Sequence, residues 1–232
     1  MDRICAGVRE IDGRIGEIRP PSNILLLAPP FSDAERLAYA LVRPAETDYT
    51  VVISTDEDAP SVCTAFGEDA GRVWVLDCIT KSVVPGATDT EWVKYVGSPA
   101  DLTGIGIKFT KILDGVQRAG DAGDAAPGQV RVCVNSLSSF LIYTKLEAIY
   151  RFFHIFSARI RRMNGVGVYL LNPESVDEKT VSTLKQLMTG IIEVEACDGD
   201  PGVHALRYQD LSGRVSPRVR YHFEGDDLVV EP

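Results

Sequence analysis

Residues 23–42, NILLLAPPFSDAERLAYALV, place an apolar strand, a short loop and an amphipathic helix in succession. This is the layout of a phosphate-binding loop of the form G-x-x-x-x-G-K-[ST], whose glycines let backbone N–H groups surround phosphates while the lysine neutralises charge and the hydroxyl holds Mg²⁺. Here Ala28 and Asp33 take the two glycine positions, and Ala34 and Glu35 take the lysine and hydroxyl positions. The loop therefore lacks the groups that bind a phosphate in the usual way.

The residues that replace this motif bring negative charge to the loop. Ser32 and Glu35 have the S-x-x-E spacing of a capping box, so the sequence predicts that Ser32 caps the helix and Glu35 reaches back to the Ser32 N–H. Asp33 and Glu35 also suit the positive end of the helix dipole. An incoming phosphate would meet like charge, and we expect no cofactor here. The vestigial loop consists of Ala28, Pro29, Pro30, Phe31, Ser32 and Asp33.

Acidic residues also follow the second and third apolar segments of the chain. Asp56, Glu57 and Asp58 form one short run, and Asp77 ends the next segment. These side chains could act as a relict base or bind a cation. Because turns favour aspartate, we interpret both places as solvated acidic turns.

Histidine, cysteine and serine patterns indicate no further catalytic or metal site. His154, His204 and His222 have no Asp, Glu or Cys at ligand spacing, and the five cysteines include no C-x-x-C pair, so no metal site is predicted. Ser136 and Ser138 lack the flanking glycines of a nucleophile elbow.

The positions of these residues depend on an alternation of apolar strands and amphipathic helices. This alternation predicts an α/β fold with a mostly parallel sheet, helices on both faces and an antiparallel C-terminal edge. Strands are predicted at 24–27, 50–54, 73–76, 130–134, 166–171 and 191–195, and helices at 33–42, 59–66, 102–117, 145–163 and 177–189. We expect one domain over residues 1–232, with an N-terminal extension (1–21), a core (22–200), a mobile surface loop (117–129) and a C-terminal β meander (201–232).

Composition restricts the partners and the compartment. The net charge of −9 argues against nucleic acid and anionic membranes, which need a basic face. No apolar run approaches the ~20 residues that span a bilayer, and the N-terminal residues do not resemble a secretory signal. Cys63, Cys78 and Cys133 lie in or beside apolar segments, which predicts buried free thiols in a reducing cytoplasm.

Three longer stretches carry a family resemblance: VVISTDED (51–58), SPADLTGIGIKFTKIL (98–113) and residues 130–195, which begin VRVCVNSLSSF. Together they resemble KaiC-like, RecA-superfamily ATPase domains of a divergent haloarchaeal type, over about residues 22–200. The resemblance implies a RecA-like fold with its phosphate loop after the first strand.

The same resemblance assigns roles that this chain cannot fill. It places Asn135, followed by Ser136, where working members carry the Walker B aspartate and serine, and Glu57 or Asp56 where they carry a catalytic glutamate. Asn135 has no charge to orient Mg²⁺, and Ala34 has no ammonium for the γ-phosphate. Two losses at distant positions favour a pseudo-enzyme.

We therefore predict a non-catalytic KaiC-like pseudo-ATPase that acts in the cytoplasm as a regulatory or scaffolding protein, through a protein partner or as a homo-oligomer. Residues 146–163 support this, because their apolar side chains cover more than one stripe of a helix. The alternative is a divergent ATP-binding protein or ATPase that uses non-standard residues such as Glu57 and Ser136.

Overall fold

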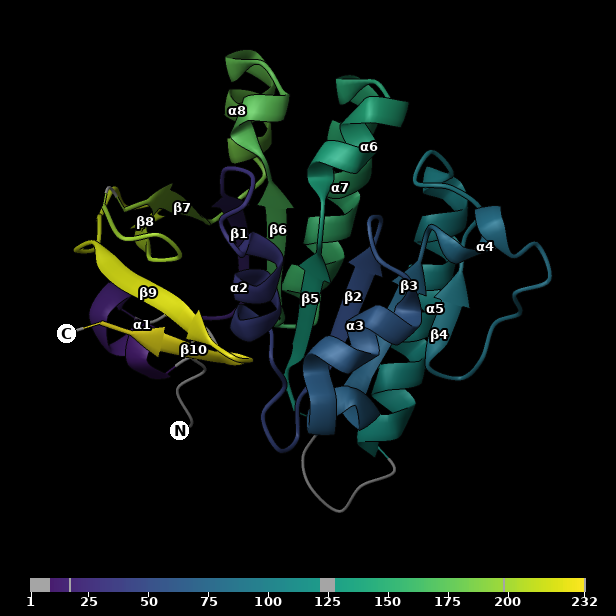
Figure 1. Cartoon of the computed structure of the whole chain (residues 1–232). Coiled ribbons are helices and arrows are strands. Elements are labelled where there is room, and N and C mark those ends of the chain that lie inside the picture. Colours follow the sequence, from purple (N-terminus) through teal and green to yellow (C-terminus); the bar gives the residue numbers. More distant parts are fainter. Residues whose placement is uncertain (1–8, 17, 122–127, 198, 232) are drawn as a thin grey trace.

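A single twisted sheet forms the centre of the molecule in the computed structural model, which describes residues 9–16, 18–121, 128–197 and 199–231. The strand order across the sheet is β10-β9-β8-β7-β1-β6-β5-β2-β3-β4 (Figure 1). The strands are β1 (Ser22–Leu27), β2 (Tyr49–Ser54), β3 (Val73–Asp77), β4 (Val93–Tyr95), β5 (Val130–Val134), β6 (Val166–Leu171), β7 (Gly190–Ala196), β8 (His204–Asp210), β9 (Val219–Glu224) and β10 (Asp227–Val230).

Pairing within the sheet follows the predicted fold class. From β7 through to β4 every neighbouring pair is parallel, whereas β8, β9 and β10 add an antiparallel edge. The central strands are buried along their whole length, as parallel strands covered on both faces must be. The six predicted strands and the C-terminal meander are therefore confirmed.

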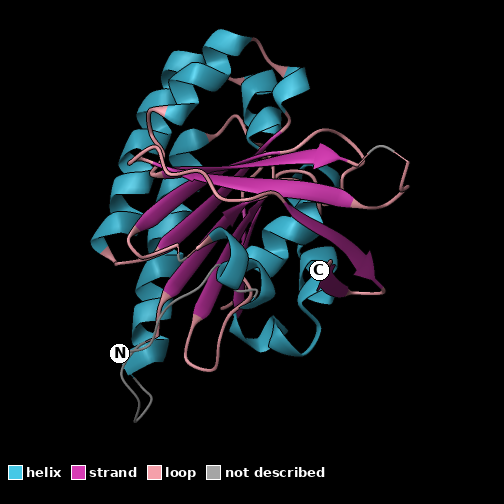
Figure 2. Cartoon of the chain, turned by 90° about the vertical axis from the view of Figure 1, so that its left-hand side faces the viewer, coloured by secondary structure: helices cyan, strands magenta, loops and turns pink. Residues whose placement is uncertain are grey.

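Helices cover both faces of the sheet, as Figures 1 and 2 show. The helices are α1 (Arg9–Ile15), α2 (Ala34–Leu41), α3 (Ala59–Phe66), α4 (Thr80–Val83), α5 (Leu102–Asp121), α6 (Leu137–Tyr143), α7 (Leu146–Arg162) and α8 (Glu178–Lys185), with 3₁₀ turns η1 (Gly67–Arg72) and η2 (Pro173–Ser175). One apolar cluster joins α1, α2 and α3 to the sheet and to the C-terminal strands. A second cluster joins α5, α6, α7 and α8 to the opposite face.

Two predicted segments differ from what the structure contains. The stretch 117–129 does not begin as a loop, because α5 continues to Asp121, and residues 122–127 lie outside the described part of the chain. The N-terminal extension contains α1, whose Ile11 and Ile15 are buried in the cluster around α2 and the C-terminal strands. Tertiary packing stabilises this short helix, which its own sequence does not strongly favour.

The thiols of Cys78 and Cys133 are buried as predicted, whereas Cys63 is only half-buried. Burial raises the pKa of the Cys63 thiol. Among the helices that the structure describes, none is both long enough and apolar enough to cross a membrane.

Candidate functional site

The predicted site residues meet in one cleft at the carboxyl ends of β1, β2, β5 and β6. This edge is where open α/β sheets bind ligands. The cleft has a volume of about 620 Å³. It is lined by Ala28, Pro29, Pro30, Phe31, Ser32, Asp33, Ala34, Glu35, Arg36, Asp56, Glu57, Asn135, Ser136, Ser138, Ser139, Leu170 and Asn172.

The loop between β1 and α2 contains no glycine, yet two of its residues have positive φ angles. Phe31 and Asp33 have φ values of 60° and 50°, which is the left-handed region that side chains rarely adopt. The Phe31 side chain is fully exposed at the mouth of the cleft. The loop thus holds a strained shape that glycine would adopt freely, and it does so with bulky and charged residues.

The predicted capping box is wrong. The residue before α2 is Asp33, in the left-handed conformation and with no side-chain cap, so the helix begins one residue later than a Ser32 cap would require. The Ser32 hydroxyl instead donates to the Pro29 carbonyl oxygen at 2.6 Å, and its side chain is buried. Glu35 consequently lies one position too early in the helix to reach back to the Ser32 N–H.

Carboxylates dominate the charge beside this loop. Burial, and then the nearby Glu57 and Asp56, raise the pKa of Glu35 to about 7. Asp56 accepts a hydrogen bond from the Ser139 hydroxyl, and Glu57 accepts one from the Tyr39 hydroxyl at 2.5 Å. Arg36 also lines the cleft, but it pairs with Asp33 at 3.5 Å and with Asp226 at 4.0 Å.

Asn135 is a structural residue in this cleft. Its side chain is fully buried, and its Oδ1 accepts from the Thr55 N–H at 2.9 Å and from the Thr55 hydroxyl at 3.3 Å. Its Nδ2 donates to Ser54 Oγ at 3.1 Å. The side chain therefore ties the ends of β2 and β5 together, with both its acceptor and its donor engaged.

The side chains of the serines after β5 also form hydrogen bonds within the protein. Ser136 caps α6 by accepting from the Ser139 N–H at 3.2 Å. Ser138 accepts from the Asn172 N–H at 3.2 Å. These hydroxyls fix the far wall of the cleft.

Two acidic residues singled out from the sequence lie away from the cleft. Asp58 is the exposed N-cap of α3 and accepts from the Ser61 N–H at 2.9 Å, which lowers its pKa. The interpretation of Asp77 as a solvated turn is wrong, because its side chain is fully buried. Its carboxylate accepts from the Ala59 N–H at 2.9 Å and from the Thr80 N–H at 2.8 Å, so it joins β3 to α3 and α4.

Sequence reasoning missed Tyr39, Ser139 and Asn172 as parts of the site. Tyr39 has the spacing of one more apolar residue of an amphipathic helix, and only the fold brings its hydroxyl to Glu57. Ser139 had a usable signal, since it follows Ser136 at the spacing of a helix N-cap and its third helical residue. Among the described residues, no three His, Cys, Asp or Glu side chains gather in a way that could hold a metal ion.

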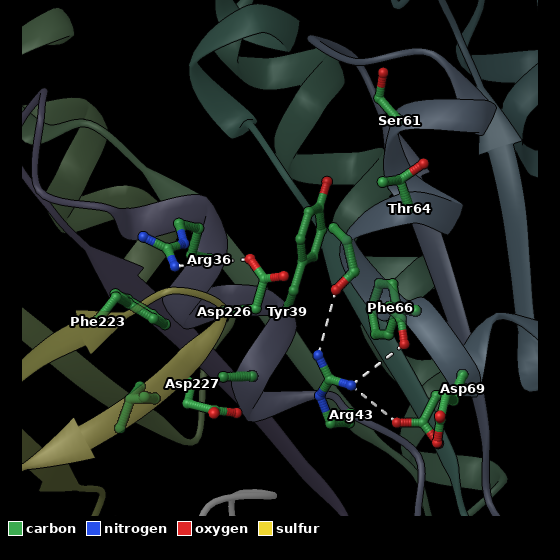
Figure 3. Close-up of a pocket in the computed structure, with 15 residues that line it drawn as sticks. Arg36, Tyr39, Arg43, Ser61, Thr64, Phe66, Asp69, Phe223, Asp226 and Asp227 are labelled. Atoms are coloured by element: carbon green, nitrogen blue, oxygen red, sulfur yellow. Dashed lines mark hydrogen bonds and ion pairs between the residues drawn. The ribbon is translucent and has the colours of Figure 1, made fainter.

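A larger hollow of about 850 Å³ lies beside the cleft, between α2, α3 and the β9–β10 hairpin (Figure 3). The Arg36 guanidinium stacks on the Phe223 ring at 4.0 Å from its centroid. Arg43 donates to the Phe66 carbonyl oxygen at 3.3 Å and pairs with Asp69 at 2.9 Å. Both arginines that line this hollow are thus engaged within the protein, and neither is available to an anionic ligand without breaking these contacts.

The sheet order and the position of the cleft define an α/β domain of RecA-like architecture. The model of the family described as "Family of unknown function (DUF7504)" matches residues 21–194, and the chain belongs to that family. No curated protein matches the sequence.

Two solved structures from Pyrococcus horikoshii show the same fold. The uncharacterized protein PH0321, crystallised in complex with an unknown peptide, has a TM-score of 0.71 and 17% identity, with 98% of each chain covered. The KaiC-like protein PH0186 has a TM-score of 0.67 and 11% identity, with 100% of this chain and 99% of that chain covered. The RecA-like, KaiC-like fold implied by the resemblance is therefore confirmed.

Proposed function

We propose that this protein is a KaiC-like pseudo-ATPase that acts as a regulatory or scaffolding protein through contacts with other proteins. The proposal depends mainly on Asn135, whose buried side chain forms hydrogen bonds with Thr55 and Ser54. The family resemblance places this residue where working ATPases have the metal-orienting acid. An amide held in this way has neither the charge nor a free oxygen to organise the Mg²⁺ shell of a nucleotide.

The loop on the other side of the cleft supports the same conclusion. Ala34 supplies no ammonium, and Glu35 stands in the first turn of α2 close enough to Glu57 and Asp56 for their charges to raise its pKa. A triphosphate would add negative charge to this group of carboxylates, and Arg36, the cation beside them, is already paired. The residues present do not fit Mg²⁺–ATP.

A function through protein contacts has separate support in the structural comparison. PH0321, which shares the fold over nearly its full length, was crystallised in complex with a peptide. We therefore favour a polypeptide, and not a nucleotide, as the ligand class of this chain, with residues 1–232 acting as one unit.

The rival function is a divergent ATPase that uses Glu57 and Ser136. Both side chains do line the cleft, which is the observation in its favour. However, Glu57 accepts from the Tyr39 hydroxyl and Ser136 caps α6, so each would have to break an existing bond before it could act.

Isothermal titration calorimetry with ATP and Mg²⁺ tests the proposal. We expect no saturable heat up to about 1 mM nucleotide, the upper end of ordinary substrate affinities. Micromolar binding that is lost in Glu57→Gln but kept in Glu46→Gln, a change at an exposed residue before β2, would overturn it in favour of the rival.

A further inference from the structure

Helices α5 and α7 lie on the face of the sheet opposite to α2 and α3 (Figure 1). An apolar groove of about 350 Å³ lies between these two helices. It is lined by Leu102, Thr103, Gly106, Ile107, Thr110, Phe152, Ile155, Phe156 and Arg159. Phe156 forms part of the floor, stacked on Phe109 with ring centroids 4.0 Å apart. The groove is therefore built on a packed aromatic base.

The rims of this groove carry large apolar side chains that packing does not explain. Ile107 on α5 is 55% exposed and Ile155 on α7 is 59% exposed. The same helix α7 buries Ile149, Phe153, Phe156 and Ile160 against the sheet, so its core-facing stripe is complete without Ile155. Exposed apolar side chains on both rims of one groove, which do not contribute to the core, mark a binding surface.

Cations border the groove although the whole chain has a net charge of −9. Lys111 follows Ile107 by one helical turn, and Arg151 and Arg159 lie one turn before and after Ile155, so all three share the stripes of the rim residues. The acids among the described side chains of these helices are Asp114 and Glu147. The cations are Lys108, Lys111, Arg118, Arg151, Arg159, Arg161 and Arg162.

The exposed cations of this list differ from the arginines elsewhere in the fold. On α2 and the C-terminal strands, Arg36, Arg43 and Arg207 each pair with a carboxylate. Within the described residues, Arg159 forms no ion pair and donates instead to Thr110 Oγ1 at 2.6 Å. Lys111, Arg151 and Arg162 are likewise exposed and without an acidic partner in that part of the chain. Lys108 is the exception, since it pairs with Asp89 at 2.6 Å. The positive charge of Lys111, Arg151, Arg159 and Arg162 is available to a ligand.

We infer that the groove between α5 and α7 docks an acidic, amphipathic helical segment of a partner protein. The stretch from Leu102 to Thr110 runs about 12 Å at 1.5 Å per residue, which accommodates roughly two turns of a docked helix. Its apolar side chains, three or four residues apart, lie over Ile107, Phe152 and Ile155, and its carboxylates face Arg159, Arg162 and Lys111. This deepens the proposed function, on which it rests, by naming the surface and the chemistry of the partner.

A nucleic acid or a membrane does not match this surface as well. Phosphate backbones need a continuous basic face, whereas the centre of the groove is apolar and the protein as a whole is acidic. A flat bilayer would contact the rims but would leave the groove between the two helices unfilled.

Peptide display tests the inference directly. A library of random peptides of about 15 residues, some four helical turns, is selected on the full-length protein, and the enriched peptides are then tested for binding to Ile155→Glu. We expect the enriched peptides to carry a net negative charge and large apolar residues three or four positions apart. Peptides retained equally by Ile155→Glu, or enriched peptides that are basic or uncharged, would overturn the inference.

A fluorescence anisotropy titration of one enriched peptide then measures each part of the surface. Ile155→Glu should weaken binding at least tenfold, about 1.4 kcal/mol, and the double change Lys111→Glu/Arg162→Glu should weaken it several-fold, with a loss of affinity at high salt. Leu211→Glu, at an equally apolar exposed residue on the C-terminal edge, and Lys179→Glu on α8 should leave binding unchanged. A proline at the centre of the peptide should abolish binding, because it breaks the helix.

Two further measurements separate the inference from its competitors and from the proposed function. Self-association in sedimentation that Ile155→Glu abolishes, or binding to anionic vesicles that competes with the peptide, would replace the proposed occupant with a second copy or a membrane. Calorimetry with ATP on the same proteins is independent of the groove. If the protein binds both ATP and the peptide, only the pseudo-ATPase proposal is overturned. If it binds neither, only the docking site is overturned.

Discussion

The cleft beside the β1–α2 loop and the groove between α5 and α7 have opposite chemistry. The cleft gathers Glu35, Asp56 and Glu57, at the place where a nucleotide-binding relative would need positive charge. The groove has an apolar centre, and the exposed Arg159 and Arg162 of α7 form no ion pair within the described residues. The expected site is therefore acidic, and the basic surface lies where no motif predicted it.

The two regions also differ in how many of their side chains already form hydrogen bonds within the protein. In the cleft, Asn135, Ser136 and Glu57 each hold another part of the protein in place. In the groove, Ile107 and Ile155 are more than half exposed. Burying exposed apolar surface releases free energy on binding, whereas breaking satisfied polar bonds costs it. A ligand gains more from the groove than from the cleft.

The largest expected effect is a difference in stability between variants of the buried face of α7 and variants of its exposed face. Phe153→Ala should lower the free energy of unfolding by about 3–5 kcal/mol, because Phe153 is fully buried against Phe140 and Tyr169. Ile155→Ala should stay within about 0.5 kcal/mol of wild type. Urea denaturation measures both. A loss above about 2 kcal/mol in Ile155→Ala would mean that Ile155 belongs to the core and not to a docking surface.

The next effect concerns the buried amide of the cleft. Asn135→Asp should cost about 2–4 kcal/mol, because a carboxylate would lose the donor to Ser54 and be buried close to other acids. Asn172→Asp is the matched control, since Asn172 is partly exposed and needs only its acceptor oxygen for the Glu174 N–H. If the two variants unfold at the same urea concentration near neutral pH, Asn135 does not have the structural role assigned to it.

A smaller effect follows from the raised pKa of Glu35. Because this pKa is about 7 in the folded protein against 4.5 ordinarily, the native state favours the protonated form. Stability should be highest below pH 4.5 with respect to this group, and should fall as the pH rises through 7. Glu35 is partly exposed, so solvent screening reduces the loss to on the order of 1 kcal/mol.

Glu35→Gln measures this contribution directly. The variant should be more stable than wild type at pH 8 and should lose that advantage as the pH falls below 7 and the native carboxyl takes up its proton. Thermal unfolding across this range provides the comparison, with Glu46→Gln as an exposed control that should follow the wild-type curve. An unchanged profile in Glu35→Gln would show that the pKa of Glu35 is not raised in the folded protein.

The smallest expected effect is no change at all. Asp33→Gly with Ala34→Lys supplies the second glycine and the lysine of the phosphate-loop pattern but leaves Glu35 and Asn135 in place. Since the metal-orienting acid is still missing, phosphate release from ATP should stay at the background rate. Turnover above background in this double variant would contradict the proposal that Asn135 prevents hydrolysis.

The sequence predicted the sheet better than the details of the site. Runs of Val, Ile and Leu in β1, β5 and β6 need no context to favour buried parallel strands, and the alternating C-terminal segments predicted the antiparallel edge. The helix α6 was missed because it is short and its sequence is ambiguous. The capping box failed because the left-handed backbone at Asp33 depends on the packing of the loop and not on the residue spacing.

The sequence by itself determined that the first turn of α2 has no lysine and that the end of β5 has no aspartate, because the identities of Ala34 and Asn135 are sufficient for that. Only the tertiary structure decided what these positions do instead. Asn135 bonds Thr55, which is 80 residues away along the chain, and the groove requires α5 and α7 to pack side by side on one face of the sheet. Contacts between residues so far apart in the chain form only when the whole domain folds, so local sequence patterns do not predict them.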